Sequence, residues 1–159
     1  MTIRVAQYKG VSLTSRLIKF CTGGVYSHTA IMLEEDCIVE AWEGTGSVRI
    51  IKSLSEGHTP GTPIDIYHVD IPPHKEKEFR EFVMGEVGKS YSMRGLIAFY
   101  FNSINWRRDD EWFCSQLMVG GCHSINEMFW GEGTKPYQIS PSSLVRNSHF
   151  RYINSYVTA

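Results

Sequence analysis

The chain has 159 residues, of which 42% are hydrophobic and 21% charged, which is typical of one folded domain rather than a disordered chain. Its net charge of −1 gives no overall reason to expect nucleic acid or an anionic membrane as a partner. Residues 1–7 lack the features of a signal peptide, and no segment approaches the ~18 apolar residues of a membrane-spanning helix. We therefore predict one domain over residues 1–159, cytoplasmic as synthesised, with no integral membrane segment and no nucleic acid partner.

The four cysteines are Cys21, Cys37, Cys114 and Cys122, and they form neither a C-x-x-C pair nor a dense framework. Reduced thiols are therefore expected in the cytoplasm. Cys114, Cys122 and His123 offer an alternative as a partial zinc site, but their spacing matches no common zinc pattern. We accordingly expect no metal and no cofactor.

The first half of the chain predicts short strands joined by tight turns, which is typical of an antiparallel meander. The expected strands cover residues 4–8, 26–33, 37–42, 48–51 and 64–69, and residues 53–63 are expected to form a loop. Between the first two strands, Ser12 is suited to cap a short helix. The buried stripe of that helix is expected to be Leu13, Leu17 and Ile18, and Gly23-Gly24 to end it.

The second half predicts mainly helices. Phe79, Phe82 and Val83 fall on one face of a helix expected over residues 74–87. The other expected elements are a buried helix over residues 92–101, a polar loop over 102–111, a helix from Cys114 to Val119 that stops at Gly120-Gly121, a short helix at Pro141 and a strand over 150–154. Strands followed by helices are typical of an α+β fold.

Cys114 lies where a loop turns into an apolar helix. A cysteine at the start of a helix faces the positive end of the helix dipole and the unpaired N–H groups of the first turn. Both favour the thiolate, which is the nucleophilic form. The alternative is an inert buried cysteine, the commoner role in apolar surroundings.

A cysteine nucleophile needs a base, and the base needs a partner that orients it. His28 lies near the start of the second predicted strand, and Glu40 lies in the next one, so the two side chains can meet across the ladder. Glu43 is the rival orienter, because the sequence does not fix the strand register. The alternatives are a hydrogen-bonded surface histidine and a solvated carboxylate on an edge strand.

Five segments in a defined order carry a resemblance to a known family. They are Tyr26-Ser27-His28-Thr29-Ala30-Ile31, Val39-Glu40-Ala41, Gly88-Lys89-Ser90-Tyr91, Phe113-Cys114-Ser115-Gln116-Leu117 and Ile139-Ser140-Pro141-Ser142-Ser143-Leu144. In this order the chain resembles the circularly permuted NlpC/P60 cysteine hydrolases of the papain-like superfamily, in particular the YiiX/YaeF-like group. Gln116 stands where an acid is common in that family, and we expect it to have a packing or supporting role.

The resemblance implies one permuted NlpC/P60-like catalytic domain, with a small antiparallel, barrel-like sheet packed against helices. It also implies a cysteine peptidase or amidase in which Cys114 is the nucleophile, His28 the base and Glu40 the orienter. Tyr26 is a further candidate, placed close to the site to bind the oxyanion together with the backbone N–H of Cys114.

Cell-wall peptides are the leading substrate class that the resemblance implies. Reaching them from the cytoplasm would require a phage-like or toxin-like delivery route. One alternative is a lipid-directed acyltransferase or thioesterase, with residues 96–101, Phe129 and Trp130 as its acyl surface, although such apolar runs more often form core. A non-catalytic binding module is the other. The sequence determines neither the substrate, whether peptide, amide or acyl, nor the oligomeric state.

Overall fold

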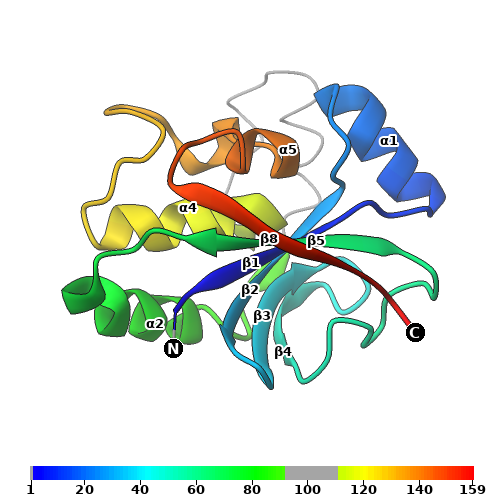
Figure 1. Cartoon of the computed structure of the whole chain (residues 1–159), viewed down its shortest axis with the longest axis horizontal. Helices are drawn as coiled ribbons and strands as arrows, with labels where there is room; N and C mark the ends of the chain where they lie inside the picture. The colour runs from blue at the N-terminus through cyan, green and yellow to red at the C-terminus, as the bar shows by residue number, and fades with distance from the viewer. Residues whose placement is uncertain (1, 92–110) are drawn as a thin grey trace.

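The structure, a computed structural model, describes residues 2–91 and 111–159 (Figure 1). The predicted helix over residues 92–101 and nearly all of the predicted loop over 102–111 lie outside these residues. The described strands and helices are β1 (Arg4–Tyr8), α1 (Leu13–Thr22), β2 (His28–Glu34), β3 (Cys37–Trp42), β4 (Ser47–Ile51), β5 (Pro63–Val69), α2 (Glu76–Gly85), β6 (Ser90–Tyr91), β7 (Glu111–Trp112), α4 (Cys114–Ser124), α5 (Pro141–Leu144) and β8 (Phe150–Val157). The predicted α+β class is confirmed.

The strands form one eight-stranded sheet in the order β7-β6-β4-β3-β2-β1-β5-β8. Every neighbouring pair is antiparallel except β6 and β7, which run parallel. Tight turns place β2, β3 and β4 side by side, as a meander requires. Within the described strands the sheet is open, with β7 and β8 at its edges, so the expected barrel-like closure is not found there.

The two faces of the sheet are packed separately. Val5, Ile31 and Val39 are cross-strand neighbours and point into the larger core, which they share with buried residues of α2 and α4. Figure 1 shows these two helices side by side on one side of the sheet. Ala6 and Ala30 face the opposite way, into a smaller cluster. The alternation of side chains along each strand therefore separates the two clusters.

Helix α4 does not stop at Gly120-Gly121, as the sequence predicted, but continues to Ser124. A Cβ on Gly120 would lie 2.7 Å from the ring of Trp112, and one on Gly121 would lie 2.5 Å from the ring of Phe79. These glycines therefore allow the helix to approach its neighbours closely. Glycine lowers the intrinsic stability of a helix, but at these two positions a larger residue would clash with the neighbouring rings.

Helix α1 begins where the sequence predicted, but its apolar side does not lie on the core. The Ser12 side chain accepts a hydrogen bond from the Ser15 N–H, at 3.1 Å. Ile18 is buried, whereas Leu13 is 84% exposed and Leu17 is 59% exposed. The predicted stripe is therefore wrong for two of its three residues, because α1 lies at the edge of the molecule, away from α2 and α4 (Figure 1).

Two other predicted elements differ from the structure only in extent. The last strand runs to Val157 rather than ending near residue 154. The helix expected over residues 74–87 is a short 3-10 turn followed by α2, with Phe79 and Val83 buried as predicted. No helix within residues 2–91 or 111–159 has both the length and the apolar character needed to cross a membrane.

Candidate active site

The β2–β3 register brings His28 to Glu40. Ile31 pairs with Val39, so Glu40 lies diagonally across the ladder from His28. The His28 Nε2 is 2.7 Å from the Glu40 Oε2, and the Glu40 side chain is fully buried. Glu43, the rival orienter, is exposed and lines the pocket described below.

Arg49 is a second partner of Glu40, and sequence reasoning missed it. It is the direct cross-strand neighbour of Glu40 in the β3–β4 ladder. Its Nε and Nη2 donate to the Glu40 Oε1 at 2.9 and 2.6 Å, and its guanidinium lies over the ring of Trp42. A guanidinium that donates two bonds to one carboxylate oxygen fixes both its charge and its orientation. A correct register for β4 would have revealed this pair.

His58 is the third partner of Glu40 and comes from the predicted loop. Its Nε2 lies 3.0 Å from the Glu40 Oε2, and its ring stacks on Tyr8 with the centroids 4.0 Å apart. Gly57 precedes it with φ of 78°, and a Cβ there would lie 2.8 Å from Arg49. The glycine therefore lets the loop cross close to Arg49. No periodic pattern in the sequence signals such a contact.

The charges of this group follow from burial and hydrogen bonding. Burial opposes ionisation of Glu40, but hydrogen bonds from His28 and His58 hold its pKa well below the usual range. Burial alone would lower the pKa of His28, but its interaction with Cys114 and its hydrogen bond with Glu40 outweigh burial and raise that pKa to about 10. Burial lowers the pKa of His58 despite its bond to Glu40. At neutral pH the group is therefore an imidazolium, a carboxylate and a neutral histidine that donates a hydrogen bond.

Cys114 is the first residue of α4 and is 2% exposed. Its side chain is close enough to His28 to raise the pKa of that histidine, and because the His28 Nε2 faces Glu40, the Nδ1 is the nitrogen left for the sulfur. The Phe113 N–H donates to the Gln116 Oε1 at 2.9 Å, so Gln116 supports the turn that starts the helix. The structure thus brings Cys114, His28 and Glu40 into one chain of contacts.

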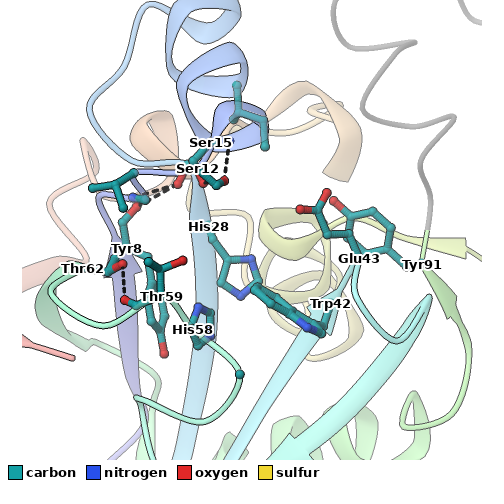
Figure 2. Close-up of a pocket in the computed structure, with 15 residues that line it drawn as sticks. Tyr8, Ser12, Ser15, His28, Trp42, Glu43, His58, Thr59, Thr62 and Tyr91 are labelled. Atoms are coloured by element: carbon teal, nitrogen blue, oxygen red, sulfur yellow. Dashed lines mark hydrogen bonds between the residues drawn. The ribbon is translucent and has the colours of Figure 1, made fainter. Parts of the chain in front are cut away.

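A cavity of about 190 Å³ opens beside this group. Figure 2 shows His28 in its wall between His58 and Trp42, with Glu43 and Tyr91 grouped on the other side of Trp42. Ser12 and Ser15 of the α1 region also line the cavity, whereas Cys114 is not among its lining residues. Burial raises the pKa of the Tyr91 hydroxyl, and electrostatic interactions with Cys114 and Glu43 raise it further. Tyr91 is therefore the lining tyrosine that is close to Cys114.

Tyr26 is engaged elsewhere. Its hydroxyl donates to the Asp65 Oδ2 at 2.5 Å and lies 2.8 Å from the Tyr67 hydroxyl. It is not among the residues that line the cavity. This arrangement corrects the expectation that its hydroxyl faces the site, and Tyr91 replaces it as the nearby tyrosine.

Among the described residues, the group suited to hold a metal ion is His28, Glu40 and His58. One donor atom from each lies within 4.8 Å of the others. Cys114, Cys122 and His123, the combination weighed from the sequence, do not form such a group there.

The fold of the chain is similar to that of a protein of known structure. No protein-family model and no curated relative matches the chain. Among solved structures, it is similar to YiiX of Escherichia coli, which is described as a metalloprotein. The TM-score is 0.69 and the identity 16%, over 98% of this chain and 97% of YiiX. At that identity the similarity shows the fold alone, so the chain has the YiiX fold along nearly its whole length.

Proposed function

We propose that the protein is a cysteine hydrolase in which Cys114 is the nucleophile, His28 the base and Glu40 the orienting carboxylate. The observation that supports this most is the position of His28, whose Nε2 lies 2.7 Å from the buried Glu40 and whose pKa is raised by the neighbouring Cys114. A base held between nucleophile and carboxylate is the arrangement that nucleophilic catalysis requires. Arg49 and His58 keep Glu40 ionised and fixed in direction.

The proposed reaction has two stages. The Cys114 thiolate attacks a substrate carbonyl carbon, and the tetrahedral oxyanion collapses as His28 donates its proton to the leaving amine. The products are the free amine and a thioester on Cys114. His28, now neutral, takes a proton from water, and the resulting hydroxide releases the acyl group as a carboxylate and regenerates the thiolate. The backbone N–H of Cys114 is free of helical bonds and is a candidate donor to the oxyanion.

The proposed substrate is a peptide or related amide, with cell-wall peptides as the leading class. Cys114 is buried, so the substrate carbonyl must reach the sulfur past His28 and Tyr91. A cytoplasmic origin with phage-like or toxin-like delivery remains part of this proposal.

The proposal is tested by the alkylation rate of each cysteine with iodoacetamide, followed by mass spectrometry across pH. Cys114 should react below the pH of ~8.5 at which a free thiol ionises, and His28→Gln should abolish this advantage. Cys122 is the internal control, because it is buried in α4 and burial raises its pKa. Equal rates at Cys114 and Cys122 would refute the reactive pair.

Hydrolysis of cell-wall peptides is the second measurement. Cys114→Ala should remove the activity, and Cys21→Ala is the matched control, because Cys21 lies on α1 and is not a lining residue of the cavity. Retained activity in Cys114→Ala would exclude this nucleophile.

The lipid-directed alternative loses part of its support. Phe129 and Trp130, expected to form an acyl surface, are partly buried and pack against the larger core. Residues 96–101 lie outside the described part of the chain. A thioester or ester substrate would use the same three residues, so substrate screening separates it from the amidase.

A divalent cation site is the second candidate function, favoured by His28, Glu40 and His58 and by the description of YiiX as a metalloprotein. Two imidazoles and one carboxylate are ligands that zinc accepts, and bound zinc supplies a Lewis acid and an acidified water. The residue types fit, but Arg49 already occupies the Glu40 Oε1, and its positive charge opposes a cation there. We therefore rank this candidate second.

Metal content after dialysis against zinc separates the two candidates. A zinc site would bind one equivalent and lose it in His58→Gln, while Cys114→Ser would retain it. If the protein is a cysteine hydrolase without a metal, no zinc should be retained after dialysis. The alkylation rate of Cys114 should then fall less in His58→Gln than in His28→Gln.

A further inference from the structure

Helix α1 carries an apolar surface that faces away from the protein. Leu13, Leu17 and Phe20 are spaced four and three residues apart, so they share one side of the helix. They are 84%, 59% and 82% exposed. We call these three residues the apolar α1 face. Ile18 lies on the opposite side and is buried, so this helix is oriented with its larger apolar side outward.

The surroundings of the apolar α1 face are basic. Arg16 is three residues from Leu13 and four from Phe20, so it borders this face, and Lys19 follows in the next turn. Neither is in a salt bridge within the described residues. The net charge of −1 conceals this local bias, since helix α1 contains Arg16 and Lys19 and no Asp or Glu.

We propose that α1 docks on an anionic phospholipid bilayer through the apolar α1 face. An apolar helix side flanked by basic residues is the pattern of helices that lie in the membrane interface, and each Lys or Arg near an anionic surface adds to the attraction. Helix α1 would lie between the lipid and the cavity, because Ser15 and Ile18 on its other side line that cavity. The cavity would then be held about one helix diameter, ~10 Å, from the lipid.

Charge selects the bilayer over a second copy of this chain. Two α1 faces packed together would bring two copies of Arg16 and Lys19 close, with no acidic residue in either helix to compensate. An anionic lipid surface supplies that negative charge. Among the other described elements, β4 and α2 each expose one apolar side chain, Ile50 and Met84, at 41%. The edge strand β8 exposes Tyr152, Ile153, Tyr156 and Val157 as two adjacent pairs, with no basic residue between them.

The test is flotation of the purified protein with vesicles of phosphatidylcholine alone or mixed with phosphatidylglycerol. We expect the protein to float with the mixed vesicles, to float less as salt screens the attraction, and to stay behind with phosphatidylcholine alone. The double variant Leu13→Gln/Phe20→Gln should lower the partition coefficient at least about tenfold, since burial of a large apolar side chain is worth that much. Arg16→Gln/Lys19→Gln should remove the difference between the two vesicles.

Val157→Gln is the matched control, because Val157 is 65% exposed on a strand remote from α1 in sequence. Cys114→Ala should float like the wild type, so failure of the hydrolase would not be mistaken for failure of docking. Flotation that Leu13→Gln/Phe20→Gln leaves unchanged, or that Val157→Gln reduces equally, would overturn the proposal. So would a dimer, seen by analytical ultracentrifugation, that only the α1 variant dissociates.

Discussion

The two sides of the cavity are built in opposite ways. On one side, His28 of β2 lines the cavity, and Glu40 of β3 and Cys114 of α4 lie behind it, almost completely buried. On the other side, α1 contributes Ser15 and Ile18 to the cavity and leaves its larger apolar side exposed. The first side is packed within the core of the protein, whereas helix α1 lies at the edge of the molecule with most of its apolar side chains exposed.

The difference separates residues that must keep their position from residues that are available for contact. A buried carboxylate is tolerated only when it is paired and hydrogen-bonded, so Glu40 constrains every group that touches it. Exposed apolar side chains on α1 contribute little to stability and can be used at another surface. Substitutions on the two sides should therefore differ sharply in their cost.

The largest effect is expected for Glu40→Gln. It removes the charge that pairs with Arg49 and the imidazolium of His28, and an uncompensated buried charge costs about 3–5 kcal/mol. Chemical denaturation should show this loss in the free energy of unfolding. Glu35→Gln is the control, because the Glu35 side chain is 71% exposed in its pair with Arg4 and such pairs contribute at most ~1 kcal/mol. Equal losses would mean that the Glu40 group is not a buried network.

Gly121→Ala should destabilise the Cys114 side by about 1–3 kcal/mol, the usual cost of overpacking. The new methyl would lie 2.5 Å from the Phe79 ring, which is itself fully buried and has little room to move. Gly85→Ala at the end of α2 is the matched control, since a Cβ there meets nothing within 4 Å. Thermal unfolding should therefore show a lower midpoint for Gly121→Ala alone.

The pH dependence of stability should report the charge on His28. Its pKa is raised to about 10 in the folded protein, above the ~6.5 of an unfolded histidine. The folded state therefore binds the extra proton, and this stabilisation is complete below pH ~6.5 and is lost as the pH rises toward 10. The free energy of unfolding should fall by up to about 1.4 kcal/mol per pH unit in that window.

Two variants isolate that slope. His28→Gln should remove it, whereas His58→Gln should keep it, because burial lowers the pKa of His58 and confines its own slope, of opposite sign, to pH values below ~6.5. A slope that both variants share would assign the titration to another group.

How well the sequence predicts each side of the cavity depends on how far apart in the sequence the interacting residues lie. The strands β2 and β3 are consecutive and joined by a tight turn. The sequence can therefore predict that His28 and Glu40 lie close together. Arg49 needed the register of a further strand, and His58 needed the path of an irregular loop. Neither leaves a periodic signal.

Helix periodicity failed for a different reason. It predicts an apolar side on α1 but does not state what covers that side, so it places Leu13 and Leu17 in the core, whereas both are exposed. In α4, Gly120-Gly121 predicts a helix end, because glycine is common there. The role of these glycines in close packing depends on the rings of Trp112 and Phe79. No pattern in the sequence indicates that either ring packs against the helix at this point.

The smallest effect, and the sharpest contrast, is expected on α1. Leu13→Gln/Phe20→Gln should change the free energy of unfolding by no more than about 0.5 kcal/mol, as for most exposed substitutions, because both side chains are more than four-fifths exposed. Ile18→Ala, one turn away on the buried side, should cost about 2–4 kcal/mol through the cavity that it leaves. Urea denaturation of the three proteins measures both. If the double variant is as destabilised as Ile18→Ala, the apolar α1 face is part of the core, and it is not available to a lipid surface.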